Sequence, residues 1–290
     1  MKLVTFTHQG STRIGVVVGD AVADVTAVAP EIPREMIAFL TAGNSAMDRT
    51  RALVQSAPRI PLAQLKLQAP VLRPPEFLAI GLNYADHVAE TGREKPSFPM
   101  FFNKQSSCVT GPFDPIHLPR ASTWLDYEGE LGFVIGRRCR HVPRARAREV
   151  IAGYLIVNDV SVRDWQRRAQ TMTLGKSFDT HGPCGPWIVT PDEIGDPHTL
   201  ELRTLVNGEE RQHSNTRNLF FDCFEQVETL STVFTLLPGT IISTGTPAGV
   251  AGAMKPPKWL KAGDLVRVEI DRIGYIENRV IDEPAETAQL

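Results

Sequence analysis

Short apolar runs separated by glycine-containing turns dominate the first part of the chain. These runs lie at 3–6, 14–18 and 21–25. Apolar runs of this length joined by tight turns predict a three-stranded β-meander. A helical pattern then opens at Pro33 and stops at Gly43, and a second helix is expected over residues 45–56.

Repeated proline interrupts this pattern before the rest of the chain begins. The prolines are Pro58, Pro61, Pro70, Pro74 and Pro75. Proline continues neither a helix nor a central strand, so we place a domain boundary near residue 70. The sequence thus predicts a small N-terminal α+β domain over 1–70 and a larger domain over 71–290.

The larger domain is rich in β-branched runs bounded by glycine and proline. Strands are expected at 77–80, 131–135, 151–157, 187–189, 200–206, 240–243 and 265–270. Only short helices are expected between them, at 84–91, 145–151, 162–170 and 221–232. Irregular strand spacing with few helices predicts a β-rich α+β domain and not a doubly wound parallel sheet.

Composition and charge argue against several classes of protein. The 290 residues carry a formal net charge of −2, so the overall field gives no reason to expect a nucleic-acid partner. The four cysteines form no C-x-x-C pair, which argues against a zinc clip or a disulfide framework. We see neither a signal peptide nor an apolar run near the roughly 20 residues of a membrane helix. A cytoplasmic protein without a membrane partner is therefore expected.

Acidic side chains alternate at the start of one apolar strand. Asp126, Glu128 and Glu130 precede or enter the strand over 131–135, so they are expected on one face of it. Like charges this close require either a fully solvated strand face or a bound cation. The strand alone leaves both interpretations open.

A further acidic residue, Asp159, follows the strand over 151–157 and precedes a polar helix. Asp159 or Asn158 can simply cap that helix. Two carboxylate clusters at strand ends nevertheless favour one shared site. Glu128, Glu130 and Asp159 form an all-oxygen set of ligands, which suits Mg²⁺ or Mn²⁺ better than zinc.

Basic and amide side chains lie close to these acids in the sequence. Arg163 and Gln166 fall one turn apart, where a guanidinium either binds a substrate carboxylate or stays on a solvated surface. Lys176 is either a surface lysine or a cation that stabilises an oxyanion. The turn over 243–249 has N–H groups suited to a carboxylate, although alone it indicates only a turn.

A histidine and a glutamate share one face of the short helix over 84–91. His87 and Glu90 are i,i+3 neighbours. A carboxylate on one imidazole nitrogen fixes the tautomer and leaves the other nitrogen free as a base. The alternative is an exposed salt bridge on a short helix. The polar segment 93–97 that follows is typical of a mobile lid.

Five ordered motifs resemble those of the fumarylacetoacetate hydrolase family. They are GLNYADHVAE at 81–90, DYEGELGFVIG at 126–136, GYLIVNDVSVRDWQ at 153–166, GKSFDTHGPCGPW at 175–187 and ISTGTPAGV at 242–250. The resemblance covers about residues 70–281. It implies a mixed β-roll catalytic domain that usually assembles as a homodimer.

The resemblance also implies a role for each site residue. Glu128, Glu130 and Asp159 match ligands of Mg²⁺, which Mn²⁺ or Ca²⁺ replaces in some members. His87 and Glu90 match a water-activating pair, and Lys176 matches a third catalytic residue. The positions implied to contact a small keto-acid substrate are Arg163, Gln166, Thr246 and Tyr84.

The implied activity is hydrolysis of a carbon–carbon bond in a 2,4-dioxo acid of the acylpyruvate or fumarylpyruvate type. It releases pyruvate and a carboxylic acid, as in the catabolism of aromatic compounds. The same metal site also suits a decarboxylase or isomerase of a dicarboxylic keto acid, of the oxaloacetate decarboxylase or 2-hydroxyhepta-2,4-diene-1,7-dioate isomerase type. A catalytically silent binding protein is a third alternative.

Three positions depart from the pattern of the family. His181 and Cys184 stand where an aromatic and an aliphatic residue are expected, and Gln105 stands where proline is common. They lie close to the expected pocket, so they leave the identity of the substrate open.

Overall fold

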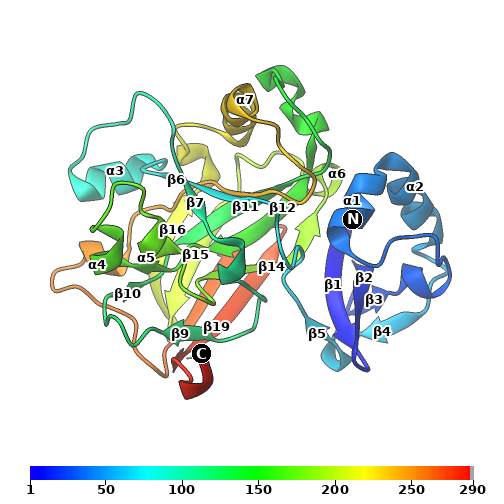
Figure 1. Ribbon diagram of the computed structural model, residues 1–290, viewed down its shortest axis with the longest axis horizontal. Helices are drawn as coiled ribbons and strands as arrows, with labels where there is room; N and C mark the ends of the chain where they lie inside the picture. The colour runs from blue at the N-terminus through cyan, green and yellow to red at the C-terminus, as the bar shows by residue number, and fades with distance from the viewer. Residues whose placement is uncertain (288–290) are drawn as a thin grey trace.

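The chain begins with a small lobe built on an antiparallel meander. The computed structural model describes residues 1–287. The lobe consists of β1 (Lys2–His8), β2 (Ser11–Val18), β3 (Ala21–Ala23), α1 (Met36–Ala42), α2 (Asn44–Leu53) and β4 (Arg59–Pro61). The predicted meander and both predicted helices are therefore confirmed. This lobe is coloured blue in Figure 1.

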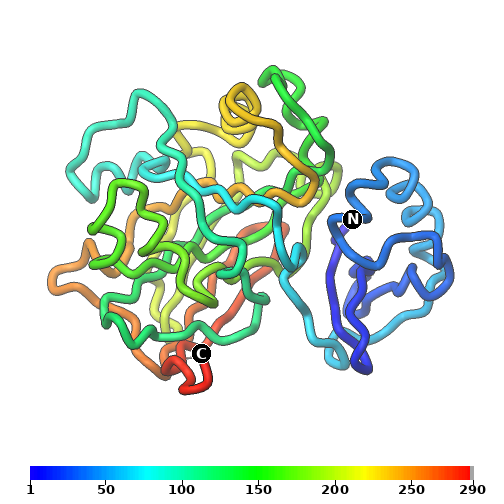
Figure 2. The backbone as a smooth tube through the Cα atoms, in the orientation of Figure 1, coloured from blue at the N-terminus to red at the C-terminus, as the bar shows by residue number. Residues whose placement is uncertain are grey.

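Strand β1 joins the lobe to the rest of the protein. Its second edge pairs antiparallel with β14 (Gly182–Val189), and Lys2 lies opposite Val189. One twelve-stranded sheet results, in the order β4-β3-β2-β1-β14-β12-β11-β17-β6-β7, with β5 beside β1 and β8 beside β14. Figure 2 shows the chain leaving the lobe in the segment before β6. The sheet thus continues across residue 70, and a division into two domains there stays a prediction.

The other strands of this sheet carry most of the predicted apolar runs. They are β5 (Lys66–Leu67), β6 (Phe77–Gly81), β7 (Met100–Lys104), β8 (Val109–Thr110), β11 (Gly129–Ile135), β12 (Ile151–Asn158) and β17 (Ile241–Ser243). Every residue of β11 and β12 is buried, which explains their unbroken apolar character. β7 was not predicted, because exposed and buried positions follow no regular alternation along it.

A second sheet of five strands packs against the first. Its order is β16-β15-β18-β19-β9, and its strands are β9 (Ile116–Leu118), β15 (Glu201–Val206), β16 (Glu209–Asn215), β18 (Leu265–Ile270) and β19 (Gly274–Asp282). Phe133 and Leu202, one from each sheet, belong to the same buried cluster. The sheets approach closely at Gly129, where an added Cβ would lie 2.2 Å from Oγ1 of Thr204. A glycine is therefore required at this position.

The helices are few and short. They are α3 (Ala85–Thr91), α4 (Arg163–Gln166), α5 (Thr173–Lys176), α6 (Pro191–Ile194) and α7 (Cys223–Val233). The β-rich mixed fold predicted from the sequence is confirmed. Within residues 1–287, no helix combines the length and the apolar character needed to cross a membrane.

Two predicted helices differ from the structure. Residues 145–151 instead contain a 3₁₀ turn, Arg144–Glu149. The helix predicted over 162–170 ends at Gln166. The chain then folds back so tightly that a Cβ on Gly175 would meet the backbone nitrogen of Gln166 at 2.2 Å. This return, which the hydrophobic pattern does not encode, brings Lys176 to the end of β12.

Candidate metal centre

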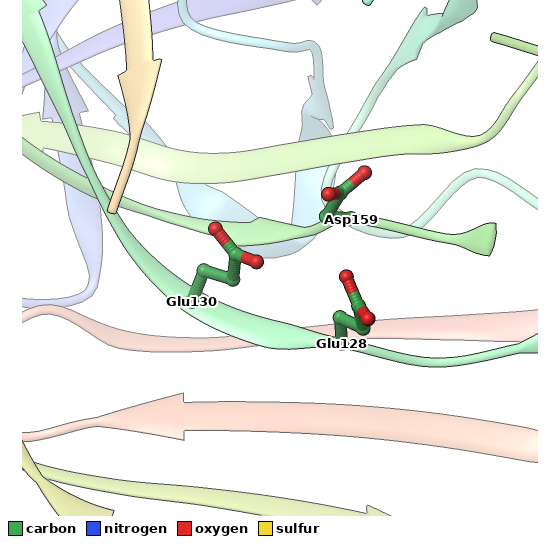
Figure 3. Close-up of side chains that lie close together, drawn as sticks. All are labelled: Glu128, Glu130 and Asp159. Carbon is green, nitrogen blue, oxygen red and sulfur yellow. The ribbon is translucent and has the colours of Figure 1, made fainter. Parts of the chain in front are cut away.

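Three carboxylates converge where two neighbouring strands meet. β11 and β12 run antiparallel, with Gly129 opposite Asn158, so the start of one lies beside the end of the other. Glu128 and Glu130 flank Gly129, and Asp159 directly follows β12. One oxygen from each of the three carboxylates lies within 4.8 Å of the other two (Figure 3). All three residues are at most 5% exposed.

Asp126 does not belong to this set, contrary to the expected alternation along one strand. The strand is interrupted: β10 (Leu125–Asp126) pairs with β13 (Ser161–Val162), and β11 begins only at Gly129. Asp126 accepts hydrogen bonds from the N–H of Ala251 at 2.8 Å and of Gly252 at 2.9 Å. It also accepts one from Nε of Arg163 at 2.8 Å. Its carboxylate therefore holds Arg163 instead of joining the other three acids.

Three buried cations surround the carboxylates. Nζ of Lys176 lies 2.5 Å from Oε2 of Glu128 and 2.6 Å from Oδ2 of Asp159. Arg163 approaches the other oxygen of Glu128 at 2.7 Å. Lys104 approaches Oδ1 of Asp159, also at 2.7 Å, and donates to the backbone oxygen of Lys176. Sequence reasoning missed Lys104 as a site residue, because it lies on the unpredicted strand β7.

Glu130 is the carboxylate that lacks a cationic partner among residues 1–287. Its Oε2 accepts hydrogen bonds from Oγ of Ser243 at 2.5 Å and from the N–H of Gly245 at 2.8 Å. Burial raises the pKa of Glu130 well above its ordinary value, and the negative charges of Asp159 and Glu128 raise it further. Around Glu128, burial also opposes ionisation, but Arg163 and Lys176 outweigh it and lower the pKa. Among the three converging carboxylates, Glu130 is therefore the one whose negative charge is not paired with a cation within residues 1–287.

The donor set fits a divalent cation. With Asp126 included, four carboxylates face the three cations Lys104, Arg163 and Lys176. One negative charge is therefore unbalanced when all four carboxylates are ionised, and the raised pKa of Glu130 shows that the metal-free centre opposes this charge. Oε1 of Glu130 has no hydrogen-bond partner in the described part of the chain. Each carboxylate oxygen has two lone pairs, so an ion and Lys176 can share Glu128 and Asp159. Buried, all-oxygen ligands of this kind suit hard cations such as Mg²⁺ and Mn²⁺.

His87 and Glu90 form the pair expected from their spacing on α3. Nδ1 of His87 lies 3.1 Å from Oε2 of Glu90. Oε1 of Glu90 accepts a hydrogen bond from the N–H of Gly249 at 2.9 Å, which fixes the carboxylate. The accepting carboxylate places the imidazole proton on Nδ1 and leaves Nε2 as the basic nitrogen. His87 is 9% exposed and therefore largely buried.

The residues expected to contact substrate differ in the hydrogen bonds that their side chains already make within the protein. Arg163 donates from Nη1 to Oε1 of Gln166 at 2.9 Å, so these two side chains are already hydrogen-bonded to each other. Thr246 donates to the backbone oxygen of Gly129 at 3.1 Å and accepts from Nε2 of Gln212 at 2.8 Å. Tyr84 is fully buried, and its hydroxyl has no partner within residues 1–287. A role in substrate binding stays a prediction for all four.

Of the atypical residues, His181 and Cys184 are fully buried. Nε2 of His181 lies 2.9 Å from the backbone oxygen of His117, so it donates to that oxygen. A cavity of about 340 Å³ is lined by both histidines and by Phe178. None of the three converging carboxylates lines this cavity, so the structure does not connect His181 directly with the metal centre.

The sequence profile described as Fumarylacetoacetate (FAA) hydrolase C-terminal matches residues 76–281. The chain belongs to the fumarylacetoacetate hydrolase family. The resemblance seen in the five motifs is thereby confirmed, and the β-rich fold agrees with the solved structures of the family.

Relatives in this family are enzymes with different reactions. The chain is 41% identical over 287 residues to oxaloacetate tautomerase Fahd2a, mitochondrial, of Rattus norvegicus, covering 97% of this chain and 92% of that protein. It is 34% identical, with a TM-score of 0.81, to maleylpyruvate hydrolase from Sphingobium sp. SYK-6 in complex with manganese (II) ion and pyruvate. It is 37% identical, with a TM-score of 0.80, to 5-carboxymethyl-2-hydroxymuconate delta-isomerase from Mycobacterium smegmatis. Both structural matches cover 98% of this chain and 100% of the other. Because the rat relative is mitochondrial, a cytoplasmic location stays a prediction.

Proposed function

We propose that this family member is a divalent-metal-dependent enzyme that transfers a proton at C3 of a small 2-oxo dicarboxylic acid. The specific reaction proposed is keto–enol tautomerisation of oxaloacetate. The observation that carries the proposal is the convergence of the buried carboxylates of Glu128, Glu130 and Asp159, of which Glu130 lacks a cationic partner within residues 1–287. Identity of 41% to an oxaloacetate tautomerase over nearly the whole chain supports the choice of substrate.

A bound Mg²⁺ or Mn²⁺ would supply Lewis-acid polarisation of the 2-oxo group and would stabilise negative charge on its oxygen. Glu128, Glu130 and Asp159 are the residues that would hold the ion. Lys176 uses two of its three N–H donors on carboxylates, so one remains for an enolate oxygen. Arg163 donates one hydrogen bond to Asp126 and one to Gln166 and forms an ion pair with Glu128. Its Nη2 makes no hydrogen bond within residues 1–287, and the donors that remain suit a substrate carboxylate.

The proton transfer itself is assigned to His87. In the keto-forming direction, the enol hydroxyl loses its proton and C3 gains one, so no other co-reactant is needed. Nε2 of His87 carries the proton to C3, while Glu90 stabilises the imidazolium through Nδ1. The reverse direction uses the same nitrogen as the base.

Spectrophotometry of the oxaloacetate enol tests this proposal. Loss of the enol absorbance should accelerate with protein and Mn²⁺ and should return to the background rate with a chelator. His87→Ala should lower the rate by about 10²-fold or more. Glu94→Gln, which alters an exposed side chain, should leave the rate unchanged. Wild-type protein that fails to accelerate enol loss with either Mg²⁺ or Mn²⁺ would rule out the proposed reaction.

Hydrolysis of an acylpyruvate is the second candidate, and the His87–Glu90 pair specifically favours it. Hydrolysis needs a base that activates water, and an imidazole fixed by a carboxylate is suited to that task. A panel of acylpyruvates, fumarylpyruvate and maleylpyruvate, scored for pyruvate release, separates the two reactions. Faster pyruvate release than enol conversion would make hydrolysis the main activity. Decarboxylation, scored as CO₂ release from oxaloacetate, and assembly as a homodimer stay predictions.

A further inference from the structure

One turn contacts both the metal centre and the helix that carries His87. This turn, residues 244–249, is called the 244–249 turn below. On the side of the metal centre, the N–H of Gly245 donates to Oε2 of Glu130 at 2.8 Å. The hydroxyl of Thr246 donates to the backbone oxygen of Gly129 at 3.1 Å. The turn therefore holds the strand segment that carries two of the three carboxylates.

On its other side, the same turn binds α3 and Asn83, which lies two residues before the helix. Asn83 donates to the backbone oxygen of Thr244 at 2.7 Å. The N–H of Ala248 donates to Oδ1 of Asp86 at 3.3 Å, and the N–H of Gly249 donates to Oε1 of Glu90 at 2.9 Å. The N–H and the hydroxyl of Thr244 also donate to the backbone oxygen of Leu131 on β11, at 2.9 Å and 2.8 Å. Residues 244–246 thus contact the metal strand, and residues 248–249 contact α3.

Helix α3 depends on these polar contacts for its position. It has seven residues, and His87 and Val88 are its only buried ones. A helix of two turns is not stable alone in water, so its docking decides whether it forms. Asp86 connects the helix to two separate segments, because Oδ1 accepts from Ala248 of the turn and Oδ2 accepts a hydrogen bond from Ser214 of β16 at 2.5 Å.

The turn itself has little freedom to adapt. Gly245 and Gly249 have φ values of +97° and +103°. A Cβ on Gly249 would lie 1.9 Å from the backbone oxygen of Arg211 on β16. A tightly packed turn of this kind transmits a shift from one side to the other and does not absorb it.

We propose that Asp86 is a positioning residue that couples metal binding to the docking of α3 through the 244–249 turn. Glu130 would hold the cation with the carboxylate that accepts from Gly245, and the turn would then hold Asp86 and Glu90 through the N–H groups of Ala248 and Gly249. Docked α3 in turn fixes the position of His87. The inference deepens the proposed function, since it concerns the same site, and linkage requires the coupling to be equal in both directions.

Hydrogen exchange of α3, measured with and without Mn²⁺ alone, tests this coupling. The variants are Asp86→Ala and, on β16, Ser214→Ala, which removes one contact of Asp86 without altering the helix. Glu94→Gln is the matched control, because this exposed acid in the segment after α3 makes no hydrogen bond or ion pair within residues 1–287. Titration calorimetry gives the Mn²⁺ dissociation constant of each protein.

In the wild type and in Glu94→Gln, Mn²⁺ should slow exchange of residues 85–91 about tenfold or more. In both test variants this protection should fall severalfold, and the Mn²⁺ dissociation constant should rise by the same factor. With oxaloacetate, kcat should fall more than KM rises, because His87 is misplaced while the metal centre is kept. Ser214→Ala decides the matter if Asp86→Ala does not fold.

Equal protection by Mn²⁺ in all four proteins would overturn the inference, and so would a wild-type α3 that is indifferent to Mn²⁺. Neither exchange nor calorimetry involves a substrate. A protein inactive on oxaloacetate whose α3 protection still depends on Asp86 would reject the proposed function and keep this inference. A protein that is active on oxaloacetate but whose α3 protection does not depend on Asp86 would keep the proposed function and reject this inference.

Discussion

Replacing Lys104 with methionine should make the protein less stable without metal and a tighter binder of metal. The ammonium of Lys104 lies 2.7 Å from Oδ1 of Asp159, and both side chains are at most 1% exposed. Methionine keeps the length and apolar volume of the side chain but removes its charge. With every carboxylate ionised, the acidic centre would then have two unbalanced negative charges instead of one.

The two effects have different magnitudes. Breaking a buried ion pair by removing one partner costs about 3–5 kcal/mol of folding free energy. The lower end applies to Lys104→Met, because Asp159 keeps its bond to Lys176. An ion bound to Oδ1 would lie within about 5 Å of the ammonium, given metal–oxygen distances of about 2.1 Å. At an effective dielectric constant of about 20, their repulsion is on the order of 6 kcal/mol. Relief of even a quarter of it tightens Mn²⁺ binding about tenfold.

Urea unfolding with a chelator, and calorimetric titration with Mn²⁺, measure both quantities. The control is Lys66→Met, whose lysine is 61% exposed and lies 3.0 Å from Asp114. A surface pair of this kind contributes about 0–1 kcal/mol, so both quantities should change little. If Lys104→Met unfolds like the control and binds Mn²⁺ no more tightly than the wild type, the charge balance described for the centre is incorrect.

Three further predictions concern the same centre and the atypical histidine. Glu130→Gln should abolish tight Mn²⁺ binding and lower activity about 10²–10³-fold. Stability measured with a chelator should not fall, because burial and the neighbouring acids already oppose ionisation of Glu130 in the metal-free protein. A loss of stability with binding intact would contradict this. Removing metal with a chelator should abolish activity, and Mn²⁺ should restore it, whereas activity that persists under chelation would argue against a metal enzyme. Burial lowers the pKa of His181 from 6.5 to about 3, so below pH 6.5 the unfolded chain takes up a proton that the folded protein does not. The free energy of unfolding should therefore fall by about 2 kcal/mol between pH 7 and pH 5 from this residue alone. His181→Phe should lose that part of the pH dependence. Identical pH profiles of the wild type and the variant would refute this prediction.

The apolar strands and the acidic cluster were the parts of this molecule that the sequence made predictable. β11 and β12 are buried on both faces, so their unbroken apolar runs are a strong signal. β16 was missed, because it reads EERQHSN and contains no apolar residue. The signal that was available is the Asn207-Gly208 pair before it, with φ values of +53° and +82°, which is typical of a two-residue hairpin turn.

The supporting residues of the site were harder to predict than the ligands. Glu128 and Glu130 stand out because acids are rare beside a buried strand. Lys104, Gln212 and Asp86 reach the centre only through strand pairing and loop packing between distant segments. Asp126 is the opposite case, a residue that the sequence wrongly grouped with the ligands. Strand alternation predicted it on their face, but the strand is interrupted after Asp126, and its carboxylate binds Arg163.

The charge balance also explains why one centre suits several related reactions. With all four carboxylates ionised, the three cations leave one negative charge, so a bound dication would make the assembly positive by one unit. A positive, buried centre attracts a 2-oxo acid and stabilises the charge that develops when its enolate forms. Tautomerisation, isomerisation and hydrolysis of a 2-oxo acid can all use that enolate. The residues that distinguish these reactions must therefore lie outside the three carboxylates, on α3 with His87 and around the part of the substrate beyond C3.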